Sequence, residues 1–318
     1  MMFRIWYSTE SLADFIIDNT ILRNSHVEKK RLYESDASNP RNFHTLPDRI
    51  KKILYLDSPD IIVEKDFDPI FSMEISQEAG TGHNSFQRFA RIAASVENNV
   101  PTFYVYPEAA IINRQNAPTR WDVINPLIFK ALEDVMQIYN IPALYYYFPT
   151  DYRQFPDPTM SPNQNTKGIK LNTNVRYAGC PEIDNEIRSM FSSMNEIIET
   201  INRRGIIDGT REINSNLVIR ERRAYMQSEF ARKATRPIND MSPISSTTII
   251  PTEYLINYLS RYSTAGYQTG ELLRSRQETL IYHVNASFRG DPYPGCLSHL
   301  ITCFAGREEL SKNGDGIW

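Results

Sequence analysis

The sequence predicts an α/β or α+β protein in which helices cover a β-sheet. Short apolar segments rich in β-branched and aromatic residues, which are typical of buried strands, occur at 51–64, 69–76, 101–107 and 141–149. Helical stretches separate them at 85–99 and 124–140, and the second carries apolar residues at helical spacing. Strands that alternate with helices in this way indicate a layered core.

The chain divides near residue 150. A polar segment rich in proline and turn residues, at 150–168, is a candidate boundary. We therefore predict an α/β core over 1–150 and a mostly helical part over 151–318. Within the second part, 182–204 reads as one long helix with a single apolar face, formed by Ile187, Phe191, Met194 and Ile198.

Composition restricts the class of protein. The chain has 318 residues, of which 41% are hydrophobic and 23% charged, as expected of a globular protein. Its net charge of −3 excludes a protein that coats nucleic acid through overall basicity. The three cysteines, Cys180, Cys296 and Cys303, are too few and too irregularly spaced for a disulfide framework or a zinc knuckle. Since no signal peptide or membrane span is evident either, we expect a cytoplasmic protein.

Two carboxylates mark a candidate site. Asp60 begins the strand segment 60–64, a polar turn follows, and the chain returns through 70–76. If the turn is centred on Phe67, Asp60 lies opposite Glu74, and strand alternation places Ser76 and Glu78 on the same side as Glu74. Opposed carboxylates repel unless a cation lies between them, and Mg²⁺ prefers such oxygen ligands. The alternative is a solvated hairpin face whose acids only maintain solubility.

This arrangement resembles the core of the PD-(D/E)XK nucleases, and within them the type II restriction endonucleases. The resemblance covers about residues 45–110: Pro59-Asp60, a hairpin, Glu74-Ile75-Ser76, a helix from about Phe86 and a strand at 101–106. It implies a central mixed sheet flanked by helices. It also implies Mg²⁺ bound by Asp60, Glu74 and the backbone carbonyl of Ile75, and hydrolysis of DNA phosphodiester bonds that leaves 5′-phosphate ends.

One position departs from the family pattern. Ser76 stands where the family has a catalytic lysine, which orients or deprotonates the attacking water. Glu78 could act as the base or bind a second metal, so the expected catalytic set is Asp60, Glu74, Ser76 and Glu78. Gln87 and Arg88 resemble DNA-contacting residues on the helix that follows. The alternative is a DNA-binding relative that has lost catalysis.

A glycine-containing loop allows a different interpretation. GTGHNS, at 80–85, lies between a predicted strand and a predicted helix, where free backbone N–H groups can hold a phosphate. A nucleotide-binding enzyme is therefore an alternative function. However, the loop lacks the Lys-Ser/Thr pair of a P-loop, and it also reads as a turn in which Asn84 or Ser85 caps a helix.

Positive charge is concentrated at 201–236, where nine basic and four acidic residues give +5 in a chain of net charge −3. A helix capped by Ser215 or Asn216 would place Arg220, Arg223 and Gln227 on one face, suited to a DNA groove. The alternative is a solvated helix face. Taken with the resemblance, these features predict a Mg²⁺-dependent endonuclease that acts on double-stranded DNA at a specific sequence, as a homodimer if that sequence is palindromic. The resemblance also implies a cognate methyltransferase for the same site.

Overall fold

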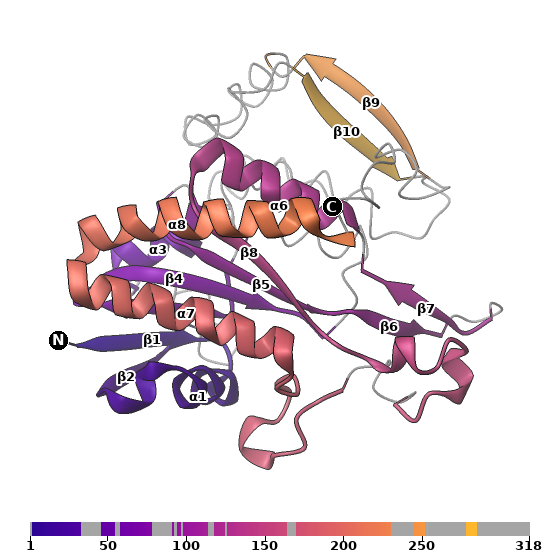
Figure 1. Ribbon diagram of the computed structural model, residues 1–318, viewed down its shortest axis with the longest axis horizontal. Helices are drawn as coiled ribbons and strands as arrows, with labels where there is room; N and C mark the ends of the chain where they lie inside the picture. The colour runs from indigo at the N-terminus through magenta and orange to yellow at the C-terminus, as the bar shows by residue number, and fades with distance from the viewer. Residues whose placement is uncertain are drawn as a thin grey trace, which may run out of the picture.

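The computed structural model describes residues 2–32, 46–54, 58–77, 91, 94–96, 98–113, 118–124, 126–163, 170–229, 245–251, 253 and 278–284. Its centre is a six-stranded mixed sheet in the order β2-β1-β3-β4-β5-β8 (Figure 1). These strands are β1 (Phe3–Tyr7), β2 (Val27–Arg31), β3 (Ile61–Lys65), β4 (Asp68–Ile75), β5 (Thr102–Pro107) and β8 (Ala143–Phe148). The predicted α/β class and its flanked mixed sheet are confirmed.

Only β3 runs against the other strands of this sheet. It pairs antiparallel with β1 and β4, whereas β1 with β2, β4 with β5 and β5 with β8 pair in parallel. The carboxyl ends of five strands therefore share one edge, together with the start of β3. Ligands of open α/β sheets bind at such an edge.

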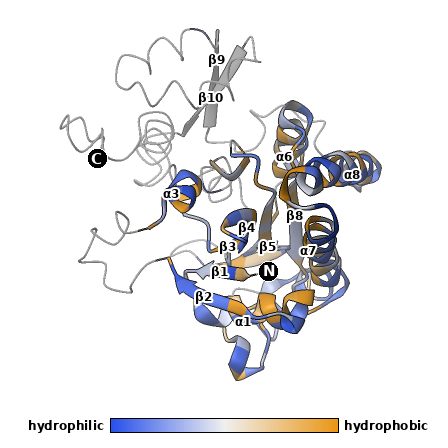
Figure 2. Ribbon diagram, turned by 90° about the vertical axis from the view of Figure 1, so that its left-hand side faces the viewer, coloured by the Kyte–Doolittle hydropathy of each residue, from blue (hydrophilic) through white to orange (hydrophobic). Residues whose placement is uncertain are grey.

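Helices cover both faces of the sheet, as the view along it in Figure 2 shows. On one face lie α1 (Glu10–Asn19) and α7 (Asn185–Arg204); on the other lie α3 (Asp48–Leu54) and α6 (Pro126–Tyr139). The helix α8 (Ile206–Gln227) packs against α7 and α6. Short 3₁₀ turns include η1 (Ile21–Asn24), η2 (Asp151–Arg153), η3 (Pro158–Met160) and η5 (Val175–Tyr177).

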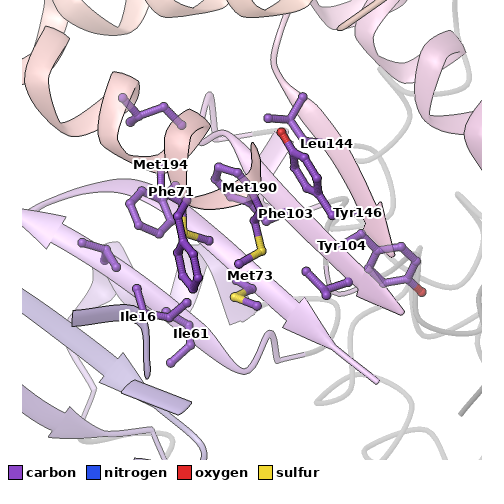
Figure 3. Close-up of a cluster of buried hydrophobic side chains, with 14 of the residues drawn as sticks. Ile16, Ile61, Phe71, Met73, Phe103, Tyr104, Leu144, Tyr146, Met190 and Met194 are labelled. Carbon is purple, nitrogen blue, oxygen red and sulfur yellow. The ribbon is translucent and has the colours of Figure 1, made fainter. Parts of the chain in front are cut away.

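The main core lies between the sheet and α7. Phe71 and Met73 of β4 and Phe103 of β5 pack beneath Met190 and Met194 of α7 (Figure 3). All of them are fully or almost fully buried, and alternate residues of the same strands face the opposite layer. This core extends from β1 to Val218 of α8, so the helices beyond the predicted boundary at 150 share it with the sheet.

The hairpin β3–β4 has an irregular register. Its turn contains Asp66 and Phe67, both with positive φ (49° and 72°), so that Lys65 pairs with Asp68. The register then shifts between Val63 and Glu64. Beyond this bulge, Ile61 pairs with Met73, the register that the sequence predicted. The bulge matters because a one-residue slip moves every side chain to the other face.

The predicted long helix is confirmed as α7, which begins after the N-cap Asp184 and buries Ile187, Phe191, Met194 and Ile198. The predicted start of the next helix was wrong. Ser215 and Asn216 lie inside α8, which begins at Ile206. The reason is Gly205, whose φ of 80° ends α7 and lets α8 begin at once.

Two small hairpins complete the described structure. In Figure 1, β6 (Ala109–Ile112) and β7 (Arg120–Val123) lie beyond the end of β5. β9 (Ser245–Pro251) pairs antiparallel with β10 (Glu278–Val284). In the portion of the chain covered by the structure, no helix has the length and apolar character needed to cross a lipid bilayer.

Candidate active site

Asp60 is held in place at the carboxyl-end edge of the sheet. It directly precedes β3, and extending the hairpin register by one residue places it opposite Glu74. Its Oδ1 accepts a hydrogen bond from Ser8 Oγ (2.8 Å) and its Oδ2 accepts one from the backbone N–H of Ile75 (3.0 Å). The backbone N–H of Ser8 also donates to the Asp60 carbonyl (2.9 Å). One carboxylate thus joins the ends of β1, β3 and β4.

Glu74 is a fully buried carboxylate near the end of β4. Its Oε1 accepts a hydrogen bond from Arg91 Nη1 at 2.6 Å, and the side chain of Arg91 is 27% exposed. A buried carboxylate is costly unless a cation compensates for its lost hydration. Arg91 supplies that positive charge from the segment between β4 and β5.

Ile75 and Ser76 complete the end of β4. A residue in an extended strand points its backbone N–H and its C=O toward the same neighbouring strand. The Ile75 carbonyl therefore faces the same side as the Ile75 N–H. That side carries Asp60. Ser76 is only 3% exposed, and its N–H donates to the Val105 carbonyl of β5 (2.9 Å). Three oxygen donors therefore lie at one corner: the Asp60 carboxylate, the Glu74 carboxylate and the Ile75 carbonyl.

Tyrosines of β5 border Glu74. Tyr104 pairs in register with Glu74, and the Tyr106 hydroxyl donates to the Tyr104 hydroxyl (2.7 Å). Burial raises the pKa of Tyr104 well above its ordinary value, and the charges of Tyr106 and Glu74 raise it further. Tyr104 therefore stays protonated at neutral pH and gives Glu74 a polar but uncharged neighbour.

This donor set fits a magnesium ion. Mg²⁺ takes hard oxygen ligands and is usually bound by one or two carboxylates, with waters and substrate phosphates completing its octahedron. Asp60, Glu74 and the Ile75 carbonyl match that requirement. In the portion of the chain that the structure describes, there is no group of three or more His, Cys, Asp or Glu side chains that could hold a metal ion, so this set would need further ligands from water or substrate.

Several predicted site residues lie outside the described residues. These are Glu78, Gln87, Arg88 and the GTGHNS loop at 80–85. The structure therefore brings together Asp60, Glu74, Ile75 and Ser76, and their roles in catalysis and metal binding remain predictions.

The predicted DNA-binding face on α8 is more neutral than its sequence suggests. Arg220 forms ion pairs with Glu196 (2.5 Å) and Glu221 (3.0 Å), and neighbouring arginines also pair with acids. Arg223 and Gln227 are exposed. Within the part of the chain that the structure covers, Arg223 forms no ion pair.

Sequence reasoning missed three residues of the site: Ser8, Arg91 and Tyr104. A signal existed for Arg91, which follows Gln87 by four residues and Arg88 by three, the spacing of one helix face. Ser8 and Tyr104 come from strands whose place beside β3 and β4 depends on long-range pairing. No local pattern of the sequence reveals that pairing.

Comparisons with known proteins add no identification. No protein-family model matches the chain, and neither a search of curated proteins nor one of solved structures found a match.

Proposed function

We propose that the chain is a Mg²⁺-dependent endonuclease that hydrolyses phosphodiester bonds of double-stranded DNA at a specific sequence. The observation that supports this most directly is the position of Asp60. Its carboxylate is fixed between Ser8 and the Ile75 amide, across the hairpin from the buried Glu74. Two carboxylates and a carbonyl at the carboxyl edge of a sheet suit a metal that acts on phosphate.

Each residue has a defined part in this proposal. Asp60, Glu74 and the Ile75 carbonyl would hold the ion, which when bound polarises the scissile phosphate and lowers the pKa of an attacking water. Ser8 fixes the orientation of Asp60 through its hydroxyl. Glu78 is the proposed general base, because the Ser76 hydroxyl is buried and is a weak base.

Arg91 can substitute for part of the role of the lysine that Ser76 replaces. Its guanidinium lies at Glu74 and is partly exposed, so it can also face a phosphate that binds there. A guanidinium stabilises negative charge on a phosphoryl oxygen but stays protonated, and so it cannot act as the base. The proposal therefore assigns charge stabilisation to Arg91 and proton transfer to Glu78.

The proposal includes a cellular setting. The enzyme would act in the cytoplasm as a homodimer, because a palindromic DNA site favours a two-fold symmetric protein. Gln87, Arg88, Arg223 and Gln227 would contact DNA, and Arg220 would position α8 through its ion pairs. A methyltransferase specific for the same sequence would protect the host DNA.

The test is cleavage of a long DNA of known sequence with Mg²⁺ or with EDTA. We expect discrete fragments with 5′-phosphate ends in Mg²⁺ alone. Glu74→Gln keeps the shape of the side chain but removes its charge, and should reduce the rate at least about a hundredfold, the loss of several kcal/mol of charge stabilisation. The matched control is Glu64→Gln, which changes a buried, arginine-paired glutamate on the adjacent strand.

The control separates catalysis from folding. Glu64→Gln should retain the cleavage pattern at temperatures where it is folded. Unchanged cleavage by Glu74→Gln, or cleavage that persists in EDTA, would contradict the proposal.

The ion pair between Arg91 and Glu74 supports a second function, a DNA-binding protein without catalysis. A guanidinium can compensate for the charge of a buried carboxylate without a metal ion, as a site that has lost its chemistry would require. This alternative predicts DNA binding in EDTA and intact DNA with Mg²⁺, Mn²⁺ and other divalent metals.

A further inference from the structure

A cavity opens at the same edge of the sheet as Asp60 and Glu74. It has a volume of about 440 Å³ and lies at the carboxyl ends of β5 and β8, beside the hairpin β6–β7 and the end of α8. Its volume falls in the range of small-molecule sites. Among the described residues, its lining consists of Glu108, Val123, Ile124, Pro126, Tyr152, Arg153 and Glu229.

The cavity contains a buried acceptor and an exposed donor. Glu108 is 4% exposed, and its Oε1 accepts a hydrogen bond from Arg153 Nε at 2.5 Å. The side chain of Arg153 is 62% exposed, and its Nη2 lies 3.5 Å from Glu229 Oε1. A ligand could therefore reach both the carboxylate of Glu108 and the remaining N–H groups of Arg153.

The framework of the cavity is already ordered. The Glu108 N–H donates to the Phe148 carbonyl (2.9 Å), and the Ile124 N–H donates to the Glu108 carbonyl (3.0 Å). The Tyr152 ring meets the Trp121 ring edge to face, with centroids 5.8 Å apart. Trp121 Nε1 in turn donates to the Phe155 carbonyl (2.8 Å). A fixed aromatic ring provides a stacking surface at little cost in conformational entropy.

The charges of the lining favour a ligand that donates hydrogen bonds. Among the lining residues that the structure describes, Glu108 and Glu229 outnumber Arg153 by one charge, which disfavours a phosphate or a carboxylate. A flat heterocycle with an amino group beside a ring acceptor fits better. The amino group donates to Glu108, the ring acceptor accepts from Arg153 and the ring stacks on Tyr152. Glutamate accepts from cytosine N4 in the same way in DNA readout.

We propose that this cavity binds a nucleobase whose Watson–Crick edge carries an amino group beside an acceptor ring nitrogen, which is cytosine or adenine. The inference deepens the proposed nuclease function and rests on it for its biological role. Glu74 pairs in register with Tyr104 of β5, and Glu108 lies four residues further along the chain, just past the end of β5 and about 13 Å away at the rise of an extended strand. Asp60 lies two strands away from β5, so a base held here is about 16 Å from Asp60, or about five nucleotides at roughly 3.4 Å each.

The test measures base preference in EDTA, where no cleavage occurs. Six-residue oligonucleotides of dC and of dT are compared by calorimetry, and cytidine and uridine by NMR titration. Cytosine carries an amino group where thymine carries a carbonyl oxygen. The wild type should therefore bind the dC oligonucleotide about tenfold more tightly, the discrimination expected of one good base contact. Glu108→Gln should remove the preference, because an amide can donate to thymine O4. Tyr152→Leu should weaken binding of both oligonucleotides.

A matched control and a second variant complete the test. Glu133 is another buried glutamate paired with an arginine, since its Oε1 lies 2.7 Å from Arg222 Nε, but it does not line the cavity. Glu133→Gln should therefore bind the oligonucleotides as the wild type does. If Glu108→Gln does not fold, Arg153→Met tests the same contact and should also reduce the preference. The proposal would be overturned by equal binding of dC and dT, or by a preference for dC that survives in these variants. It would also be overturned if arginine amide, a cation, bound more strongly than cytidine. Because cleavage is not measured, such a result leaves the Glu74 experiment unaffected.

Discussion

The two ends of the hairpin β3–β4 each contain a buried glutamate paired with an arginine, yet they differ in their surroundings. Near the turn, Glu64 accepts hydrogen bonds from Arg49 (2.6 Å) and from Trp6 Nε1 (2.7 Å), and Arg4 lies at 3.4 Å. At the open end, Glu74 accepts from Arg91 (2.6 Å), and a second carboxylate, Asp60, lies across the hairpin.

The comparison separates a structural carboxylate from a candidate functional one. Around Glu64, donors converge on a single negative charge, and the Phe67 ring lies between Arg4 and Arg49, with its centroid about 5 Å from each guanidinium. This arrangement stabilises a turn whose two residues both have positive φ. Around Asp60 and Glu74, like charges meet at the edge where sheets of this kind bind ligands. Two carboxylates that face each other across the hairpin are what the proposed metal site requires.

The largest expected effect is a difference in stability between the two glutamates. Arg4, whose side chain is 12% exposed, has fewer anionic partners after Glu64→Gln. This change should lower the free energy of unfolding by about 2–4 kcal/mol. Glu74→Gln removes a repulsion with Asp60, and the 27% exposed Arg91 regains water, so the loss should be below about 1 kcal/mol. Urea denaturation at pH 7 measures both values. Equal losses would show that the two pairs are alike.

The part of this comparison that could be predicted from the sequence is specific. The period-two pattern on both sides of the turn placed Asp60 opposite Glu74, and that register is present at Ile61 and Met73. The hairpin reaches this register in a different way from the predicted one. A turn of two residues without the bulge would pair Asp60 with Met73, and only the shift at Val63/Glu64 restores the predicted register. Bulges have no reliable local signature, so their position could not be predicted.

Long-range pairing limited the prediction of the site in the same way. Ser8 reaches Asp60 because β1 pairs with β3, and Tyr104 lies beside Glu74 because β5 pairs with β4. The basic cluster illustrates the opposite error. Its charge was read correctly from the sequence, but Arg222 and Arg220 are paired with acids on other helices, Glu133 and Glu196. A net charge over a segment does not reveal such pairing.

A third glutamate sharpens the comparison through pH. Burial raises the pKa of Glu186 to about 7, and the charge of Asp184 contributes to the rise. Between about pH 4.5 and 7 this carboxyl is more protonated in the folded state than in the unfolded state. The free energy of unfolding should therefore fall as the pH rises from about 4.5 to 7. Glu186→Gln removes this penalty. The free energy of unfolding of this variant should exceed that of the wild type by about 1–3 kcal/mol at pH 8, and the two should be almost equal at pH 4.

The measurement is urea denaturation of both proteins across that range, with the exposed Glu182→Gln as the control. A constant difference between Glu186→Gln and the wild type at all pH values would exclude titration of this group as the cause.

The smallest expected effect tests whether Arg91 and a metal ion compete for Glu74. Arg91→Met removes a cation 2.6 Å from the carboxylate, so Mn²⁺, used as a spectroscopic substitute for Mg²⁺, should bind about threefold to tenfold more tightly. Cleavage should slow at the same time, because the guanidinium no longer stabilises the phosphate. Arg49→Met removes a cation at the same distance from Glu64 and should leave Mn²⁺ affinity unchanged.

Electron paramagnetic resonance of free Mn²⁺ gives the affinity without reference to activity. Arg91→Lys retains the positive charge and should behave like the wild type in this measurement. Weaker Mn²⁺ binding by Arg91→Met would mean that Arg91 holds the metal site together and does not compete with the ion. An unchanged affinity would mean that the ion avoids the Glu74 oxygen that Arg91 occupies, and would leave Asp60 and Ile75 as its main protein ligands.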